Sequence, residues 1–86
     1  MSAGGEALLE QVRQLMASVF DLPPGDLPPN ATPDNTRNWD SLSHMALIAA
    51  LESRSGLRIS HEDAVTLLGD REIADYLVEK NAEFSA

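Results

Sequence analysis

All five prolines of the chain fall in one stretch, and this placement constrains the fold more than any other feature. They are Pro23, Pro24, Pro28, Pro29 and Pro33, all within residues 21–39. Proline lacks an amide donor, fixes φ and disfavours the helical region for the residue before it. The stretch therefore favours a long loop over a helix or a central strand. Loops longer than about 12–15 residues are uncommon in compact domains and often have a function.

Apolar residues recur at helical spacing on either side of this loop, in residues 6–20 and 41–55. Asp40 is placed to cap the second of these helices, because its carboxylate can accept from the free amides of the first turn. Gly56 is suited to the end of that helix. The two segments predict long helices joined by the proline-rich loop.

Two further helical patterns follow. Ser60 and Asp63 resemble a capping box that opens a short segment ending at Leu68. Asp70 can cap a last helix over residues 71–80, and residues 81–86 should fray. We therefore predict an all-α fold, a four-helix bundle of three longer helices and one short one. It should form a single domain over residues 1–86, with an ordered core at about residues 6–80.

The predicted core takes apolar side chains from all four helices. Its members are Leu8, Val12, Leu15, Val19, Ile48, Leu51, Ile59, Ala64, Leu68, Ile73 and Leu77. The apolar residues of the loop can anchor the loop to this core. They are Leu22, Leu27, Ala31 and Trp39.

Composition excludes several classes of function. The 86 residues include 6 basic and 14 acidic side chains, for a net charge of −8. Such a chain is not suited to binding nucleic acid or an anionic membrane. No apolar run approaches the ~20 residues of a membrane span. Residues 1–6 lack the basic and apolar regions of a signal peptide, so we expect a cytoplasmic protein.

The chemistry of the side chains is equally restricted. There is no cysteine, and the two histidines, His44 and His61, are well apart in sequence. These counts argue against a metal site and exclude disulfides or a cysteine nucleophile. Glycine-rich phosphate loops and the common hydrolase motifs are absent.

One candidate site remains, Asp40-Ser41-Leu42, where the loop meets the second helix. Ser41 would be the first helical residue, and a phosphate attached there would gain from the free amides and the helix dipole. Asp40 can cap the helix or help to bind a metal–phosphate during attachment. The alternative is that both residues are simple caps. His44 could act as a base for Ser41, although an exposed helical histidine is the simpler interpretation.

Residues 39–52, Trp-Asp-Ser-Leu-Ser-His-Met-Ala-Leu-Ile-Ala-Ala-Leu-Glu, resemble the attachment region of acyl carrier proteins. The resemblance continues through Ile59-Ser60 and the acidic residues before Ala64. It ends at Asp75-Tyr76-Leu77, which is similar to the closing Asp-Tyr-Ile of that family. It covers residues 32–77 without gaps.

The resemblance implies a four-helix carrier whose Ser41 bears 4′-phosphopantetheine, with Asp40 and Leu42 beside it. Acyl groups would be carried as thioesters on the thiol of the cofactor, which agrees with the absence of cysteine. The chain would then be a monomeric, non-catalytic carrier. Its partners would be a phosphopantetheinyl transferase and acyl-loading, acyl-transfer or condensing enzymes. The alternative from another class is a helical interaction module without a cofactor.

The type of carrier is indicated by departures from the fatty-acid pattern. Only Glu52 is acidic between Ser41 and Ser55, and Arg37-Asn38-Trp39 replaces the usual Leu-Gly before the motif. The Gly-Gly of peptidyl carriers is also missing. The Trp-Asp-Ser-Leu-x-His pattern resembles discrete carriers of polyketide or related specialised pathways. Fatty-acid and aminoacyl or peptidyl carriers remain alternatives.

Partner enzymes are expected to meet the face around Ser41. This face would comprise Trp39, Leu42, His44 and Met45, although Met45 could equally pack in the core. In the family a cargo chain can lie between the second and third helices, in a space bounded here by Met45, Leu51, Ile59 and Ala64. A short polar cargo would lose its contacts with water there, so it should stay outside.

Overall fold

The structure is a computed structural model that describes residues 3–82 and 84. It contains α1 (Ala3–Val19), α2 (Ser41–Ser55), α3 (His61–Ala64) and α4 (Asp70–Glu79). A 3₁₀ turn, η1 (Pro24–Asp26), lies within the long loop. The described residues include no strand. The prediction of an all-α chain with three longer helices and one short helix is therefore confirmed.

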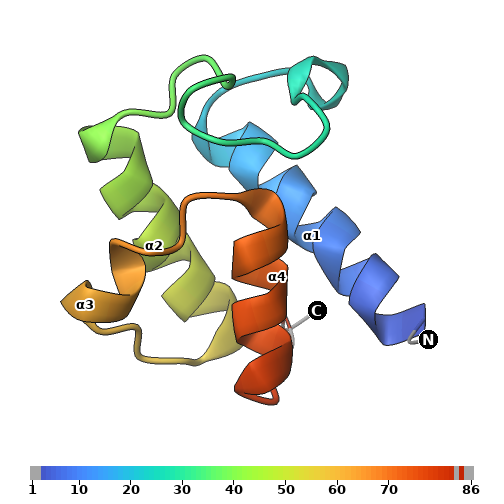
Figure 1. The fold of residues 1–86 in the computed structure, drawn as a ribbon, viewed down its shortest axis with the longest axis vertical. Helices are drawn as coiled ribbons and strands as arrows, with labels where there is room; N and C mark the ends of the chain where they lie inside the picture. The colour runs from blue at the N-terminus through green and yellow to red at the C-terminus, as the bar shows by residue number, and fades with distance from the viewer. Residues whose placement is uncertain (1–2, 83, 85–86) are drawn as a thin grey trace.

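The long helix α1 packs against both α2 and α4, and the loop crosses one end of the bundle (Figure 1). α3 lies beside α2, away from α1 (Figure 1). No helix among the described residues is long and apolar enough to cross a membrane.

The end of α1 sends the chain into the loop. Asp21 has a left-handed backbone, with φ of 57°. The Leu22 amide donates to the Ala17 carbonyl at 2.8 Å, and the Asp21 amide donates to the Ser18 carbonyl at 3.2 Å. This pair of bonds is a Schellman motif, which satisfies the last carbonyls of a helix and reverses the chain. It places Leu22 in the core.

The proline-rich loop is ordered by its own hydrogen bonds. The Asn35 side chain accepts from the Thr32 amide at 2.8 Å and donates to the Asn30 carbonyl at 3.2 Å. The loop anchors are all buried, as predicted. They are Leu22, Leu27, Ala31 and Trp39.

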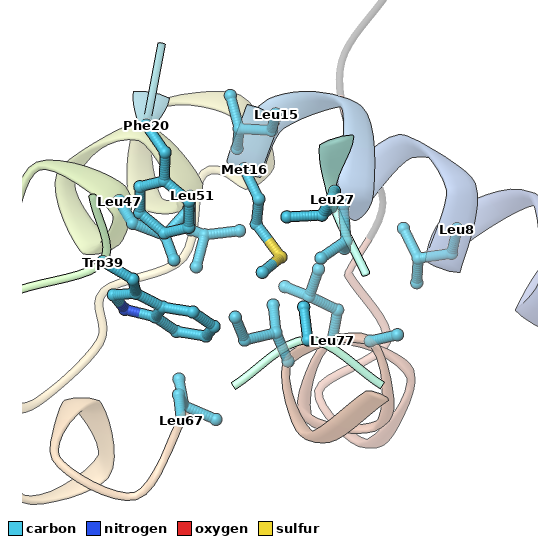
Figure 2. Packing of buried hydrophobic residues seen from close by; sticks show 14 of the residues in the cluster. Leu8, Leu15, Met16, Phe20, Leu27, Trp39, Leu47, Leu51, Leu67 and Leu77 are labelled. Atoms are coloured by element: carbon cyan, nitrogen blue, oxygen red, sulfur yellow. The ribbon is translucent and has the colours of Figure 1, made fainter. Parts of the chain in front are cut away.

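Most of the predicted core is confirmed (Figure 2). Seven of the predicted side chains are buried: Leu8, Val12, Leu15, Leu51, Ile59, Ile73 and Leu77. Val19, Ile48 and Ala64 are half-buried and pack against that cluster. Met16, Phe20 and Leu47, which the predicted set left out, are fully buried. They belong to the same helical faces, which are wider than the narrow stripe used to choose the set.

Leu68 was predicted to point inward, and this was wrong. α3 ends at Ala64 instead of continuing to Leu68, and the chain then turns through residues 65–66. The turn directs Leu67 into the core and leaves Leu68 46% exposed. A change in backbone conformation before a pair of leucines therefore decides which one is buried.

Two expectations for the last part of the chain also change. Asp70 is the first residue of α4 and is buried in an ion pair, instead of capping the helix. Phe84, in the segment expected to fray, is buried. A second Schellman motif explains this, because Asn81 is left-handed and the Ala82 amide donates to the Leu77 carbonyl at 2.8 Å. That motif turns the chain back toward the bundle.

Candidate functional site

The start of α2 is closed by a capping box. The Asp40 carboxylate accepts from the Ser43 amide at 2.9 Å, and the Ser43 hydroxyl accepts from the Asp40 amide at 2.9 Å. Two free amides are thereby satisfied. The predicted cap at Asp40 is confirmed. The hydrogen bond from the Ser43 amide is the main cause that holds the pKa of Asp40 below its usual value, so the carboxylate is charged at neutral pH.

Ser41 is the first residue of α2 and is exposed. The loop that precedes it is held firmly: the Asn38 side chain donates to the Phe20 carbonyl at 2.8 Å, and the Ser43 hydroxyl donates to the Asn38 carbonyl. Residues 38–40, which we call the attachment loop after the role expected of Ser41, are thus tied both to the end of α1 and to the first turn of α2. Ser41 stands on this rigid junction at the positive end of a 15-residue helix.

Trp39 was expected on the partner face, and the structure corrects this. Trp39 is only 5% exposed, and its ring centroid lies 5.1 Å from that of Phe20, with the two ring planes tilted by 32°. Figure 2 shows the indole among the buried leucines of the core. A large ring that can bury its body and still find a partner for its N–H is more stable inside. The role of Trp39 as a loop anchor is confirmed instead.

The partner of the Trp39 N–H is His44, which is half-buried and not an exposed helical histidine. Trp39 Nε1 donates to His44 Nδ1 at 3.1 Å, and His44 Nε2 lies 2.8 Å from the Ala64 carbonyl oxygen. An indole N–H only donates and a carbonyl only accepts. His44 is therefore neutral here, with its proton on Nε2. Both ring nitrogens are engaged, so neither is free to act as a base for Ser41.

Sequence reasoning missed this arrangement. His44 and Ala64 are 20 residues apart, and no local pattern signals a histidine that bonds to a distant backbone carbonyl. The proximity of Trp39 and His44 in sequence was visible, but the direction of both side chains depends on how α3 packs.

Around Ser41 the surface is apolar. Leu42 is 82% exposed, as expected, and Met45 is 69% exposed. Met45 therefore belongs to the surface and not to the core. Val65 and Leu68, which sequence reasoning did not place there, are also exposed and line the site. We call these four side chains the apolar face.

Two hollows adjoin the apolar face. One, of about 290 Å³, lies directly beside Ser41 and is walled by Trp39, His44 and Leu68 among others. The other, of about 320 Å³, is a groove between α2 and α3. Three of its walls, Met45, Ile59 and Ala64, were predicted. Leu51 was also predicted as a wall, but it is fully buried behind Ile48 and Ala49, which line the groove instead.

Charge is distributed unevenly over the helices. α2 carries one acid, Glu52, and one base, Arg54. α4 carries four acids against the single base Arg71. The helix that presents Ser41 is thus electrically neutral in a strongly acidic chain.

The described residues contain no group of three or more side chains that could hold a metal ion.

Comparison with known proteins identifies the family. No family model matches the chain. The chain is 33% identical over 79 residues to the acyl carrier protein of Streptomyces coelicolor, covering 91% of this chain and 86% of that protein. It is 32% identical over 75 residues to the acyl carrier protein of Thermosynechococcus vestitus, covering 87% and 93%. With this similarity along nearly its whole length and with an all-helical fold, the chain belongs to the acyl carrier protein family.

Proposed function

We propose that Ser41 is the attachment site of 4′-phosphopantetheine and that the chain carries acyl groups on it. The exposed hydroxyl at the first position of a long capped helix carries this proposal. A phosphate on that oxygen lies at the positive end of α2, where the helix dipole favours negative charge. When bound, the group supplies a terminal thiol that forms thioesters, and the chain has no cysteine of its own.

The residues around Ser41 support attachment in different ways. Asp40 fixes the first turn and keeps a negative charge beside the site, where it can help to orient a metal-bound phosphate. Leu42 projects into solvent next to Ser41 and offers a contact to the transferase. His44 lines the hollow beside Ser41 and leaves the serine hydroxyl free to attack the pyrophosphate of coenzyme A. The new phosphodiester bond would form as the bond to adenosine 3′,5′-bisphosphate breaks, and the hydroxyl proton would be released.

The apolar face is the surface that partner enzymes would meet. It combines Leu42 and Met45 of α2 with Val65 and Leu68 of the following segment. Because α2 has no net charge, long-range steering toward basic partners contributes little, and apolar contact decides recognition. This distinguishes the chain from carriers with an acidic second helix. It supports a role in a polyketide or related specialised pathway, with acyl-loading and condensing enzymes as partners.

If the cargo is short and polar, as the resemblance to discrete carriers implies, it stays outside the groove. Most of the side chains that line the groove between α2 and α3 are apolar, so a polar unit would lose water contacts there. Amide NMR shifts of the loaded and unloaded carrier should then differ only near Ser41. Large shifts at Ile59 and Ala64 with the natural cargo would contradict this part of the proposal.

The test of the attachment site is mass spectrometry after incubation with a broad-specificity phosphopantetheinyl transferase and coenzyme A. The wild-type chain should gain one phosphopantetheinyl group, and Ser41→Ala should gain none. Ser53→Ala is the matched control, because Ser53 is an exposed serine on the same helix, and it should be modified normally. An unmodified wild-type chain, with a transferase that is active on another carrier, would show instead an interaction module without a cofactor.

A further inference from the structure

The short helix α3 is held in place by residues outside it. A four-residue helix is not stable alone, because nucleation is unfavourable and few hydrogen bonds form within it. Buried side chains anchor the chain on both sides, Ile59 before the helix and Leu67 after it. Two side-chain hydrogen bonds reach α3 from other helices. His44 contacts the Ala64 carbonyl, and the Tyr76 hydroxyl donates to the Asp63 carboxylate at 2.8 Å.

His44 is also the only acceptor that the structure gives to the indole of Trp39, among the described residues. Trp39 is buried and directly precedes Asp40, the cap of α2. A buried N–H without a partner is costly, so Trp39 and His44 must move together. The imidazole thus joins two places at once, the attachment loop through Nδ1 and α3 through Nε2.

The position of His44 gives this link a functional meaning. It lines both the hollow beside Ser41 and the groove between α2 and α3, and Val65 does the same. A movement of α3 that carries the Ala64 carbonyl with it shifts the imidazole bonded to that carbonyl, and so changes the acceptor available to Trp39. A shift of α3 therefore reaches the attachment loop through one side chain.

We propose that His44 is a positioning residue that transmits the position of α3 to the loop that presents Ser41. A shift of α3 would then alter how Ser41 is presented to partner enzymes. The effect on partner enzymes rests on the proposed function of Ser41. The mechanical coupling between Trp39 and α3 can be tested without any cofactor.

The test compares hydrogen exchange in four variants: wild type, Trp39→Phe, His44→Gln and the double variant. The probe is the Val65 amide, which donates to the His61 carbonyl at 3.2 Å and so reports opening of α3. The Leu47 amide in the buried part of α2 is the control for global unfolding. Glutamine can place its amide near the position of Nε2 and bond to Ala64, but it does not reach Trp39.

In the wild-type background, Trp39→Phe should raise the exchange rate of the Val65 amide by about threefold or more relative to that of the Leu47 amide. An effect of this size is typical of couplings through packed networks. In the His44→Gln background, the same substitution should leave Val65 unchanged. A simple packing effect of Trp39 would raise exchange equally in both backgrounds, and that result would overturn the proposal. No change in either background would overturn it as well.

A second measurement links the coupling to function. The initial rate of Ser41 modification should fall in Trp39→Phe and should show no further fall when Trp39→Phe is added to His44→Gln. If the two substitutions lowered the modification rate additively in the double variant, that result would contradict the coupling. If the wild-type chain is not modified at all, the proposed function fails, while the exchange experiment still decides the role of His44.

Discussion

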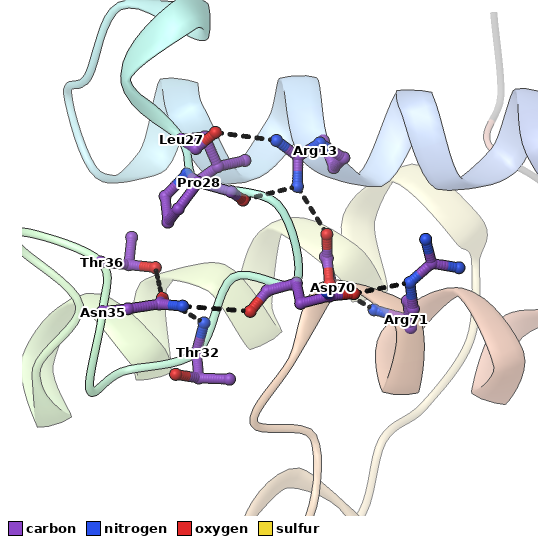
Figure 3. Close-up of polar contacts among 9 residues, drawn as sticks. Arg13, Leu27, Pro28, Thr32, Asn35, Thr36, Asp70 and Arg71 are labelled. Atoms are coloured by element: carbon purple, nitrogen blue, oxygen red, sulfur yellow. Dashed lines mark hydrogen bonds and ion pairs between the residues drawn. The ribbon is translucent and has the colours of Figure 1, made fainter.

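Two sides of this small bundle differ in how they use polar groups. At the junction of α1, the loop and α4, Arg13 donates to Asp70 at 2.6 Å and to the carbonyls of Leu27 and Pro28 at 2.9 and 3.0 Å (Figure 3). We call this the arginine junction. On the other side, α2 and the segment that follows α3 expose the apolar face, and α2 carries no net charge. One region uses charge to hold the loop, and the other is left open for contact.

The comparison shows what the acidic composition does and does not mean. The net charge of −8 suggests electrostatic recognition, but α2 contributes nothing to it. One of the acids, Asp70, is buried and serves the fold by neutralising Arg13. Partner recognition in this chain should therefore depend weakly on salt, because apolar contacts are not screened.

The largest expected effect comes from breaking the arginine junction. Asp70→Ala leaves the Arg13 guanidinium, whose side chain is 21% exposed, without its counter-charge. Removing one partner of a fully buried pair costs about 3–5 kcal/mol. Because Arg13 keeps some contact with water, we expect a loss at the lower end of this range, about 3 kcal/mol. Urea denaturation followed by the fluorescence of Trp39, the single tryptophan, measures this directly.

The matched control for that variant is Asp26→Ala. Asp26 pairs with Arg37 at 3.1 Å, but both side chains are largely exposed. Exposed pairs contribute about 0–1 kcal/mol, so the midpoint of unfolding should hardly move. Similar losses in the two variants would mean that the arginine junction is no more important than a surface contact.

The next effect separates the two faces of α2. Leu47→Ala removes a fully buried side chain and should lower the free energy of unfolding by about 2–5 kcal/mol. Leu42→Ala removes an exposed one and should change it by about 0.5 kcal/mol or less. Leu42→Ala should instead slow modification by the transferase, measured as kcat/KM. An unchanged rate with Leu42→Ala and Met45→Ala would place the partner surface elsewhere.

A smaller effect concerns the hydrogen bond between Tyr76 of α4 and Asp63 of α3. Burial raises the pKa of Tyr76 to about 12, with the Asp63 carboxylate as the second cause. A raised pKa means that the folded state holds the phenolic proton more tightly than the unfolded state, whose value is 10.0. The contribution of Tyr76 to stability is thus complete below pH 10 and is lost as the pH rises toward 12.

Ultraviolet titration can follow this single tyrosine without interference from another phenol. The midpoint should lie near pH 12 in the wild-type chain and should move toward 10 in Asp63→Asn, which removes the nearby charge. Tyr76→Phe should lower the free energy of unfolding by about 1–2 kcal/mol through the lost hydrogen bond. A midpoint near 10 in the folded wild-type chain would show that Tyr76 does not bond to α3.

The smallest effect is the acid sensitivity of the capping box. The pKa of Asp40 is lowered from 3.8, so its contribution is present above pH 3.8 and is lost as the pH falls through the lowered value. Asp40→Asn keeps an acceptor for the Ser43 amide but does not titrate. The difference in stability between wild type and this variant should therefore shrink as the pH is lowered below 3.8. A difference that stays constant with pH would show that the charge of Asp40 does not act on the cap.

Much of this fold can be predicted because it is local. Helix periodicity, the cap at Asp40 and the glycine after α2 depend on residues within a turn or two of each other. Gly56 adopts φ of 76°, which is unfavourable for most residues. The proline cluster excludes regular structure by itself. The proposed attachment site at Ser41 followed from the same local pattern, together with a resemblance over residues 32–77.

The remaining features required the tertiary structure. Whether Leu67 or Leu68 is buried depends on where α3 ends, and Phe84 reaches the core only because the chain reverses at Asn81. The burial of Asp70 depends on Arg13, which is 57 residues away. No local pattern shows which distant group will neutralise a charge.

The sequence by itself therefore determined an all-α bundle, its long loop and Ser41 at the start of a helix, because these follow from backbone preferences over short distances. Only the tertiary structure decided that Trp39 is an anchor, that Met45 is exposed and that His44 joins the attachment loop to α3. The physical reason is that side-chain burial and hydrogen bonding are settled by partners brought together when the helices pack. Trp39 and Ala64 meet the same imidazole from segments 25 residues apart.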